Sequence, residues 1–293
     1  MTVEHGYRLA GHSFSFLEHW QGRTGTHLGI KEILYQEQSP YQHILVCDSD
    51  FFGKTLILDS AINVTEFDEF VYHEMLAHPA MFSLGGAEHI LIIGGGDGGA
   101  AREVLKHKSV EHVDLVDIDD KVVEAAKRFF PNCAKAFDDP RLQLHIADGV
   151  AFAKNALASH YDLIIIDSTD PIGAGSGLFT KAFYRDCERI LRAQGMIAVQ
   201  SESPFDRPNE HILADIRSFF GEFFPIVESY LAFIPSYPTG MFSFTIASKL
   251  RHPLHNFEEN AECNSISKGC RYYNAEIHRA AFALPNFVRQ GLK

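Results

Sequence analysis

Acidic residues follow four successive apolar runs of the sequence, and this placement is the first feature that could do chemistry. The run 90–93 leads into a glycine-rich turn that holds Asp97, and the next run ends at Asp117. The third run is followed by Asp148, and the fourth ends at Asp167. Parallel strands place their carboxyl ends at one edge of a sheet, so we expect these carboxylates to share one site. A cleft lined with carboxylates concentrates cationic ligands.

The turn from Gly94 to Gly99 lets the backbone approach a ligand closely. The pyrophosphate of a dinucleotide would bind at the start of the following helix, where Asp97 would repel it. Asp97 therefore favours a cationic ligand over NAD, FAD or ATP. The alternative is that Asp97 caps the helix, which is a common use of aspartate.

Asp117 and Asp148 have the positions of nucleoside-binding residues. Asp117 follows Gly94 by 23 positions (117 minus 94), near the spacing of about 20 at which an acidic residue accepts hydrogen bonds from ribose hydroxyls. Asp148 could accept a hydrogen bond from an adenine amino group, or it could cap a helix.

Asp167 directly ends the run Leu163 to Ile166, the most apolar of the sequence. Partial desolvation there raises a carboxylate's pKa toward that of a general base. Asp170 stands before Pro171, which is also typical of a turn. A fifth run ends at Gln200, close to Glu202.

These residues need elements that position them. From residue 89 onward apolar runs alternate with helical patterns, which predicts a parallel sheet with helices on both faces. Before it we expect a hairpin and a helix from about 68 to 82 with one apolar stripe. The expected strands are 44–47, 55–58, 90–93, 113–116, 142–146, 163–166 and 196–199, and the expected later helices are 100–107, 121–130, 180–191 and 209–220.

The composition limits the function further. The formal net charge of −12 over 293 residues argues against a nucleic-acid partner; it suits a cationic substrate or serves solubility alone. No apolar run approaches the roughly 20 residues that span a membrane, and the first residues do not resemble a secretion signal. The five cysteines are scattered, so we expect reduced thiols and a cytoplasmic protein.

The sixteen histidines raise the question of a metal. His73 and His78 are the closest pair with a carboxylate between them, but they are five residues apart. On a helix this spacing turns the two rings about 140° from each other. We expect no metal site.

With these residues identified, the sequence resembles the spermidine synthases, the aminopropyltransferases of polyamine synthesis, in their bacterial form. The matching segments are 41–42, 66–75, 94–99, 138–141, 167–173, 200–204, 235–240 and 272–285. The resemblance implies an α/β fold, with a small N-terminal β-strand domain (1–70) and a Rossmann-like catalytic domain similar to class I methyltransferases (71–293). It also implies a homodimer or homotetramer.

The same resemblance assigns roles to individual residues. Asp167 matches the catalytic base. The residues that match the donor site are Gln42, Asp97, Asp117, Asp148 and Gly149. The residues that match the amine site are Tyr72, His73, Asp97, Asp167, Asp170, Gln200 and Tyr237. A loop from Ser168 to Ser176 would close over both substrates, with Trp20 nearby.

The implied reaction moves an aminopropyl group from decarboxylated S-adenosylmethionine, a co-substrate, to putrescine without any cofactor. It yields spermidine and 5'-methylthioadenosine. The sequence departs from the family pattern at Asp117, Ala174 and Phe242, where glutamate, proline and tryptophan are more usual. Two alternatives stay open: a putrescine N-methyltransferase that uses intact S-adenosylmethionine, and a polyamine-binding protein without catalysis.

Overall fold

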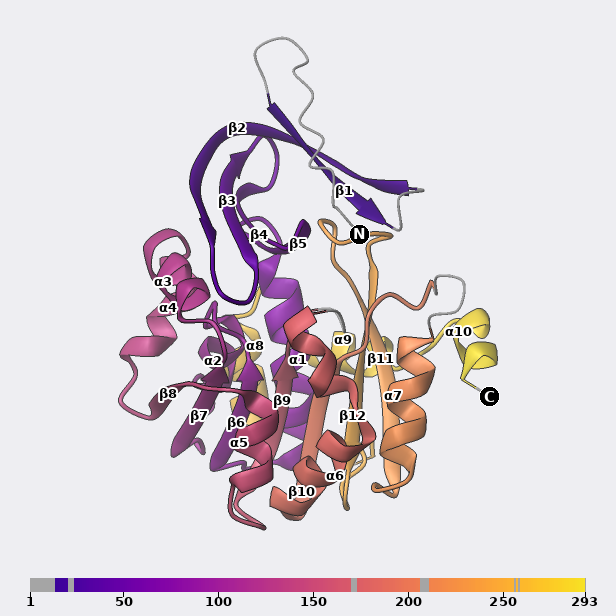
Figure 1. The fold of residues 1–293 in the computed structure, drawn as a ribbon. Helices are drawn as coiled ribbons and strands as arrows, with labels where there is room; N and C mark the ends of the chain where they lie inside the picture. Colours follow the sequence, from indigo (N-terminus) through magenta and orange to yellow (C-terminus); the bar gives the residue numbers. More distant parts are fainter. Residues whose placement is uncertain are drawn as a thin grey trace.

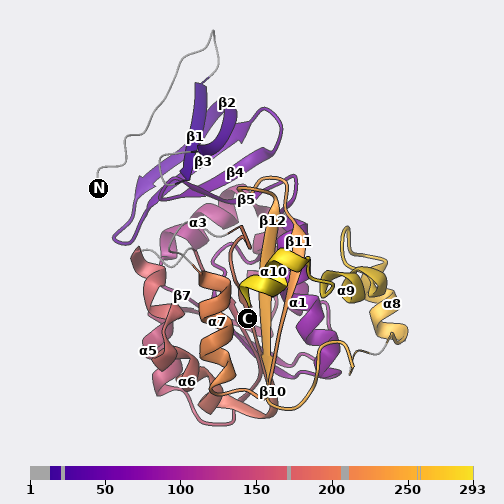
Figure 2. The same cartoon turned by 90° about the vertical axis from the view of Figure 1, so that its right-hand side faces the viewer.

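The computed structural model describes residues 14–20, 24–169, 173–205, 211–255, 257 and 259–292. Asp170, which was assigned to the amine site, lies outside the described residues, and so does the side chain of Trp20. A small β-sheet formed by the first part of the chain lies above one end of a larger α/β unit (Figure 1). The view turned by 90° shows the same separation into two parts (Figure 2).

The N-terminal sheet is an antiparallel meander in the order β1-β2-β3-β4-β5. Its strands are β1 (Phe14–Trp20), β2 (Thr24–Gln38), β3 (His43–Ser49), β4 (Gly53–Leu58) and β5 (Ala61–Thr65). The expected hairpin is β3 and β4, and the structure confirms it. The long polar strand β2 and its partner β1 were not predicted.

The second sheet has seven strands in the order β11-β12-β10-β9-β6-β7-β8. These are β6 (His89–Gly94), β7 (His112–Asp117), β8 (Leu142–Ile146), β9 (Tyr161–Asp167), β10 (Leu191–Gln200), β11 (Ile226–Phe233) and β12 (Met241–Ser248). Strands β10, β9, β6, β7 and β8 are parallel, as expected. Strand β12 is antiparallel to both β10 and β11, so the sheet is mixed rather than wholly parallel.

Helices cover both faces of this sheet. The helices of the described residues are α1 (Glu69–Leu84), α2 (Gly99–Val104), α3 (Asp120–Phe129), α4 (Pro131–Ala134), α5 (Gly149–Asn155), α6 (Lys181–Ile190), α7 (Ile212–Gly221), α8 (Ala261–Ser267), α9 (Ala275–Ala281) and α10 (Asn286–Gly291), with 3₁₀ turns η1 (Lys135–Asp138) and η2 (Gly173–Phe179). Every helix predicted from the sequence is present within a few residues of its expected ends.

The alternation of side chains along β9 shows how the two faces are used. Leu163 and Ile165 pack into the core under α1 and α2, whereas Ile164 and Ile166 pack against α5, α6 and α7. Because helices pack on both faces of β9, successive side chains of this strand are all buried, and this accounts for its unbroken apolar run. The expected Rossmann-like α/β fold with an N-terminal β-domain is confirmed.

Helix α1 differs from the single apolar stripe that we expected, because almost all of its residues are buried. Its polar side chains therefore need partners inside the protein. The carboxylate of Glu74 accepts hydrogen bonds from the backbone N–H groups of residues 271, 272 and 273, at 2.9, 2.8 and 2.8 Å. The C-terminal segment is thus tied to the helix that carries Tyr72 and His73.

The N-terminal sheet packs on α3 through a separate apolar cluster. Ile44, Val46 and Leu56 of the sheet contact Val122 and Phe129 of the helix in this cluster. A hydrogen bond of 2.7 Å from the Tyr237 hydroxyl to the carbonyl of Asn63 joins the two parts at another point. In the part of the chain that is described, no helix combines the length and the apolar character needed to cross a bilayer.

Candidate active site

A cavity of about 270 Å³ lies between the N-terminal sheet and the carboxyl ends of the central strands. Its floor includes Gly94, Asp117 and Asp167, which end β6, β7 and β9. Its roof includes Leu56 and Val64 of the N-terminal sheet. Both parts of the protein are therefore needed to enclose it.

The cavity wall is strongly acidic. The carboxylate residues that line it are Glu18, Asp59, Asp97, Asp117, Asp148, Asp167 and Glu202. No lysine or arginine lines it among the residues that the structure describes. A cavity with this lining favours a ligand with more than one positive charge.

Asp167 lies at the centre of this wall, at the end of β9. Its Oδ1 accepts a hydrogen bond of 2.7 Å from the Tyr72 hydroxyl, and its buried Oδ2 has no hydrogen-bond partner among the described residues. Burial and the nearby Asp97 carboxylate raise the pKa of Asp167 to about 7, against the opposite effects of His73 and Tyr72. Asp167 can therefore exchange a proton in the neutral pH range.

The glycine-rich turn is shaped by its contact with Asp167. Gly94 has φ of +80°, and a Cβ there would lie 2.0 Å from the carbonyl oxygen of Asp167. The N–H of Gly95 donates a hydrogen bond of 2.8 Å to the same carbonyl. Only glycine fits this close approach, which fixes the turn beside the candidate base.

Asp97, in the same turn, is only 9% exposed. Its Oδ1 accepts a hydrogen bond of 2.7 Å from the N–H of Gly99 and lies 3.2 Å from Nε2 of His73. Burial alone would raise the pKa of Asp97, but His73 and the Gly99 N–H hold it below its usual value. Asp97 therefore supports the start of α2 and also presents charge to the cavity.

The residues assigned to the donor line the cavity. Asp117 accepts hydrogen bonds of 2.9 Å from the N–H groups of Gly96 and Asp119, and burial raises its pKa to about 6 despite them. Asp148 caps α5 by accepting from the N–H groups of residues 150 and 151, at 2.8 and 3.3 Å. The capping role that the sequence left open for Asp148 is thus present, in a residue that also lines the cavity.

Gln42 and Gly149 are also in this wall. The Gln42 side chain donates a hydrogen bond of 3.0 Å to Asp119, which holds it near the end of β7. Gly149 begins α5, and a Cβ there would lie 2.4 Å from a methyl carbon of Ile93. A larger residue would push α5 away from the sheet.

Gln200, one of the residues assigned to the amine, ends β10, which lies across β9 from β6 and β7. The Gln200 amide donates to the Ser168 carbonyl at 3.2 Å and accepts from the N–H of Glu202 at 3.0 Å. Tyr237 lines the cavity and, as described above, bonds to Asn63. Glu202 has a positive φ of 61°, which is uncommon for a residue other than glycine and sets its side chain beside Gln200.

His73 also lies in the cavity wall, but both of its ring nitrogens face protein carboxylates. One of these belongs to Glu69, which sequence reasoning missed together with its partner Arg102. The signal was present, since Glu69 precedes His73 by four residues on one helix and so shares its face. The contact with Arg102 joins segments 33 residues apart and has no such local signal.

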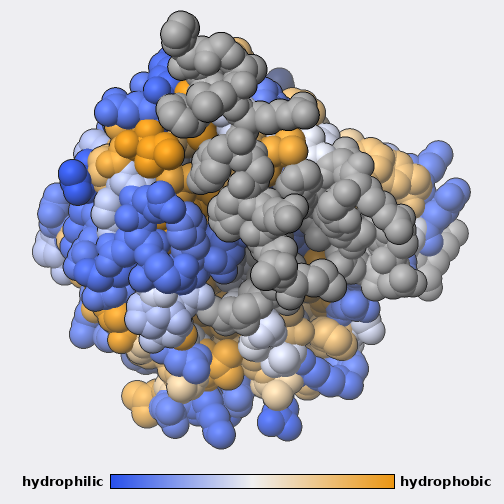
Figure 3. Space-filling view, turned by 45° about the horizontal axis from the view of Figure 1, so that its top comes forward, coloured by the Kyte–Doolittle hydropathy of each residue, from blue (hydrophilic) through white to orange (hydrophobic). Residues whose placement is uncertain are grey.

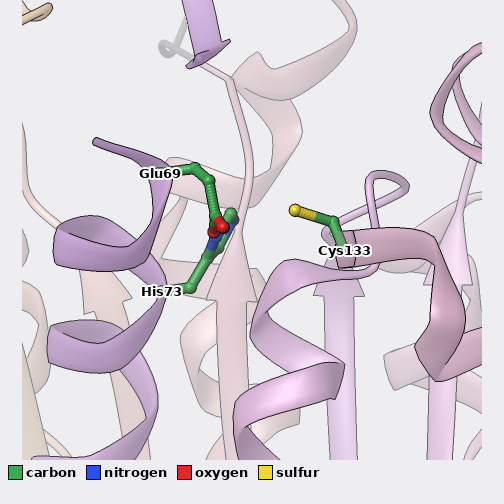
Figure 4. A group of neighbouring side chains, drawn as sticks. All are labelled: Glu69, His73 and Cys133. Atoms are coloured by element: carbon green, nitrogen blue, oxygen red, sulfur yellow. The ribbon is translucent and has the colours of Figure 1, made fainter. Parts of the chain in front are cut away.

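A third side chain approaches this pair. Figure 4 shows Cys133 of α4 pointing its sulfur toward Glu69 and His73 of α1. The ligand atoms of these three residues lie within 4.8 Å of one another. Arg102 donates hydrogen bonds to both oxygens of Glu69 and to the Cys133 sulfur. Its positive charge opposes a metal cation there.

Comparison with known proteins places this site in a family. Residues 16–66 match the profile of the "spermidine synthase tetramerisation domain", and residues 69–288 match the "spermine/spermidine synthase domain". The chain is 44% identical over 263 residues to a polyamine aminopropyltransferase of Thermoanaerobacter sp. (strain X514), covering 89% of this chain and 92% of that protein. It is 40% identical over 278 residues to a spermidine synthase of Solanum lycopersicum, covering 92% and 80%.

Solved structures agree with this. A crystal structure of a spermidine synthase in complex with the transition-state analogue AdoDATO superposes with a TM-score of 0.91 at 38% identity, covering 100% of this chain and 98% of that one. The spermidine synthase of Thermotoga maritima gives a TM-score of 0.90 at 38% identity, covering 100% and 97%. The fold is that of an aminopropyltransferase. The chain belongs to the spermidine synthase family.

Proposed function

We propose that this protein transfers the aminopropyl group of decarboxylated S-adenosylmethionine to putrescine, giving spermidine and 5'-methylthioadenosine. The observation that supports the proposal most is the position of Asp167. A carboxylate with a pKa of about 7 lies in a cavity that is otherwise lined by further carboxylates and by polar groups suited to a nucleoside.

The charges of the cavity suit both substrates. The donor carries a sulfonium and an ammonium, and the acceptor carries an ammonium at each end. A carboxylate and an ammonium about 4 Å apart attract by about 4 kcal/mol at an effective dielectric constant near 20, before desolvation is counted. Asp97 keeps its negative charge at neutral pH, because its pKa is held low. It is therefore suited to bind the donor's ammonium.

The reaction is a displacement at the carbon next to the sulfonium. The acceptor amine is mostly protonated at neutral pH, since amines of this kind have a pKa near 10. Asp167 takes one proton from it, and the freed electron pair forms the new carbon–nitrogen bond. The carbon–sulfur bond breaks, and its electrons neutralise the sulfonium. Positioning and proton removal are the main contributions.

The far end of putrescine stays protonated and needs acceptors. Gln200, Tyr237 and Glu202 line the cavity, and Asp170 would add another carboxylate. Tyr72 holds Asp167 by donating its hydroxyl hydrogen to Oδ1, and Oδ2 is left without a hydrogen-bond partner among the described residues. No cofactor is required by this chemistry, and decarboxylated S-adenosylmethionine acts as a co-substrate.

One assay tests the proposal against its nearest competitor. Purified protein is given putrescine and either decarboxylated or intact S-adenosylmethionine, and the nucleoside product is identified by mass. Aminopropyl transfer releases 5'-methylthioadenosine from the decarboxylated donor. Release of S-adenosylhomocysteine from the intact donor would instead identify an N-methyltransferase. Binding of putrescine without any product from either donor would indicate a polyamine-binding protein.

We further propose that the protein assembles as a homodimer or homotetramer in the cytoplasm. The match of residues 16–66 to a tetramerisation domain supports assembly. Hydrophobic residues reach the surface at several places on the face shown in Figure 3, and Phe51 and Phe67 of the N-terminal region are 66% and 42% exposed. The five unpaired cysteines support a reducing compartment. Light scattering of the purified protein would give the mass of the assembly.

A further inference from the structure

The ring of His73 is fixed between two carboxylates. Its Nδ1 lies 2.6 Å from Oε2 of Glu69, and its Nε2 lies 3.2 Å from Oδ1 of Asp97. The side chain is only 2% exposed. A Cβ on Gly99 would lie 2.2 Å from the ring, so α2 packs directly against it and leaves no room for the ring to turn over.

This geometry determines how many protons the ring holds. A neutral imidazole carries one N–H donor and one nitrogen with a lone pair, whereas an ionised carboxylate only accepts. A bare ring nitrogen facing either carboxylate would place two lone pairs against each other. Two ring nitrogens 2.6 and 3.2 Å from carboxylate oxygens favour a proton on each nitrogen, which makes His73 an imidazolium. Burial alone would lower the pKa of His73, but Asp97 and Glu69 raise it to about 10.

Arg102 of α2 holds Glu69 in turn. Its guanidinium donates to both Glu69 oxygens, each at 2.8 Å, and its Nε donates to Glu103 at 2.7 Å. Bidentate pairs of this kind fix orientation as well as charge. Burial alone would raise the pKa of Glu69, but His73 and Arg102 lower it to about 2. Arg102, Glu69, His73 and Asp97 thus form a row of alternating charges.

Every element around His73 contributes to its electrostatic surroundings. The ionisable groups that face it or its partners are Glu69 and Tyr72 of α1, Arg102 of α2, Cys133 of α4, Asp97 of the glycine-rich turn, and Asp167 and Asp117 at the ends of β9 and β7. Two of these carboxylates differ in their surroundings. Asp97 faces the imidazolium, whereas Asp167 has a buried oxygen without a partner.

We propose that Glu69 and Arg102 are positioning residues which hold His73 as a fixed cation against Asp97, and that this arrangement makes Asp167 the carboxylate that accepts the proton. The inference rests on the proposed aminopropyl transfer. Neither Glu69 nor Arg102 lines the cavity, so both act through His73. His73 itself supplies charge to Asp97 and takes no proton from the amine. Neighbouring carboxylates with pKa values moved apart divide their roles in this way.

The protonation of His73 can be measured without any reaction. Protein labelled with nitrogen-15 in its histidines gives ring-nitrogen shifts that distinguish imidazolium from both neutral tautomers. The His73→Gln variant identifies the His73 signals among the sixteen histidines by their loss. We expect both nitrogens of His73 to be protonated at about pH 8 in the wild type. In Glu69→Gln the His73 pKa should fall by about 1 unit or more, because a charged hydrogen-bond acceptor is lost.

Kinetics test the consequence for Asp167. The His73 cation lowers the pKa of Asp167, so loss of that cation raises the pKa of the base. The acid limb of kcat/KM should therefore move to higher pH in His73→Gln, which removes the cation. In Glu69→Gln the ring keeps its proton near pH 7, because a fall of about 1 unit from about 10 leaves its pKa above 7. Turnover of that variant near pH 7 should fall roughly 10- to 100-fold through loss of orientation, as for other residues that orient a site residue from behind. The double variant with His73→Gln and Glu69→Gln should have a turnover less than about threefold below that of His73→Gln alone, because Glu69 acts through His73.

Controls separate the possible outcomes. Glu124→Gln makes the same change in an exposed pair with Lys121 and should leave the histidine spectrum and pH profile unaltered. If Glu69→Gln does not fold, Glu69→Asp, which keeps the charge on a shorter arm, takes its place. A singly protonated His73 in the wild type at about pH 8, an unmoved acid limb in His73→Gln, or wild-type turnover in Glu69→Gln overturns the inference. Failure of the proposed reaction would appear as no product from wild type, while the histidine spectrum would still report the state of His73.

Discussion

The hydroxyl of Tyr72 donates a hydrogen bond of 2.7 Å to one oxygen of Asp167, and the other oxygen is buried without a partner among the described residues. One half of the carboxylate is therefore used for orientation, and the other half makes no hydrogen bond within the described protein. An unpaired buried oxygen costs free energy in the folded protein. We expect it to be retained because the reaction needs it.

Replacing Asp167 with asparagine should lower turnover by roughly 10²- to 10⁴-fold, the usual effect of losing a general base. The amide keeps the size of the side chain but cannot take the amine's proton at neutral pH. Donor affinity, measured by calorimetry, should change much less than turnover. Asp120→Asn, at the exposed start of α3, is the matched control. Turnover within a few-fold of wild type would show that Asp167 is not the base.

Replacing Tyr72 with phenylalanine should shift the pH dependence of the reaction. In the wild type we expect kcat/KM to rise with pH through about 7, because Asp167 must be ionised to accept a proton. The Tyr72 hydrogen bond lowers the pKa of Asp167. Without it the acid limb should move up by about 1 unit, the effect of one hydrogen bond to a charged group. An unchanged limb with lower turnover at every pH would assign Tyr72 to substrate binding alone.

Asp167→Asn should also stabilise the protein at alkaline pH. The carboxyl titrates at about 7 in the folded protein and near 4 in the unfolded chain. Between these values only the folded protein holds the proton, so the wild type loses stability as pH rises from about 4 to about 7. The asparagine variant has no such loss. The difference in free energy of unfolding, variant minus wild type, should therefore be larger at pH 8 than at pH 4, by up to about 4 kcal/mol.

The measurement is chemical denaturation of both proteins at the two pH values without substrate. A difference between variant and wild type that is equal at both pH values would contradict the raised pKa of Asp167. Because folding is measured, this result does not depend on which reaction the enzyme carries out.

Replacing Asp97 with asparagine should reduce the preference for decarboxylated donor over intact S-adenosylmethionine. The intact donor would bring its own carboxylate near Asp97, and like charges in such a site cost several kcal/mol. The decarboxylated donor presents only an ammonium there. The asparagine variant should bind the decarboxylated donor more weakly, and its affinities for the decarboxylated and the intact donor should differ by less than those of the wild type. If calorimetry gives the same affinity ratio in variant and wild type, the selectivity resides in other residues.

The carboxylates at the strand ends could be predicted because they depend on local order in the sequence. Asp97, Asp117, Asp148 and Asp167 each follow an apolar run, and parallel strands bring such positions to one edge. The structure does bring all four into the wall of one cavity. Asp148 shows the limit of such reasoning. Its position in the sequence fits either a helix cap or a ligand-binding residue, and in the structure it caps α5 and also lines the cavity.

What could not be predicted depends on contacts between distant segments. The roof of the cavity requires the N-terminal sheet to pack on α3, and no periodicity in the sequence encodes that packing. Strand β12 inserts between β10 and β11 against the direction of its neighbour β10, and a short apolar run does not specify its direction. Arg102 was missed because its role depends on α1 and α2 lying side by side.

The hydrogen bonds of Glu74 have a consequence for synthesis of the chain. This carboxylate is buried in the helix that carries Tyr72 and His73, and its last partner, the N–H of Tyr273, follows 199 residues later. Until translation has passed that residue, the helix contains a charge that has no partner and resists burial. In a growing polypeptide on the ribosome we therefore expect that this helix is not yet stably buried, although most of the strands that surround it have already been made.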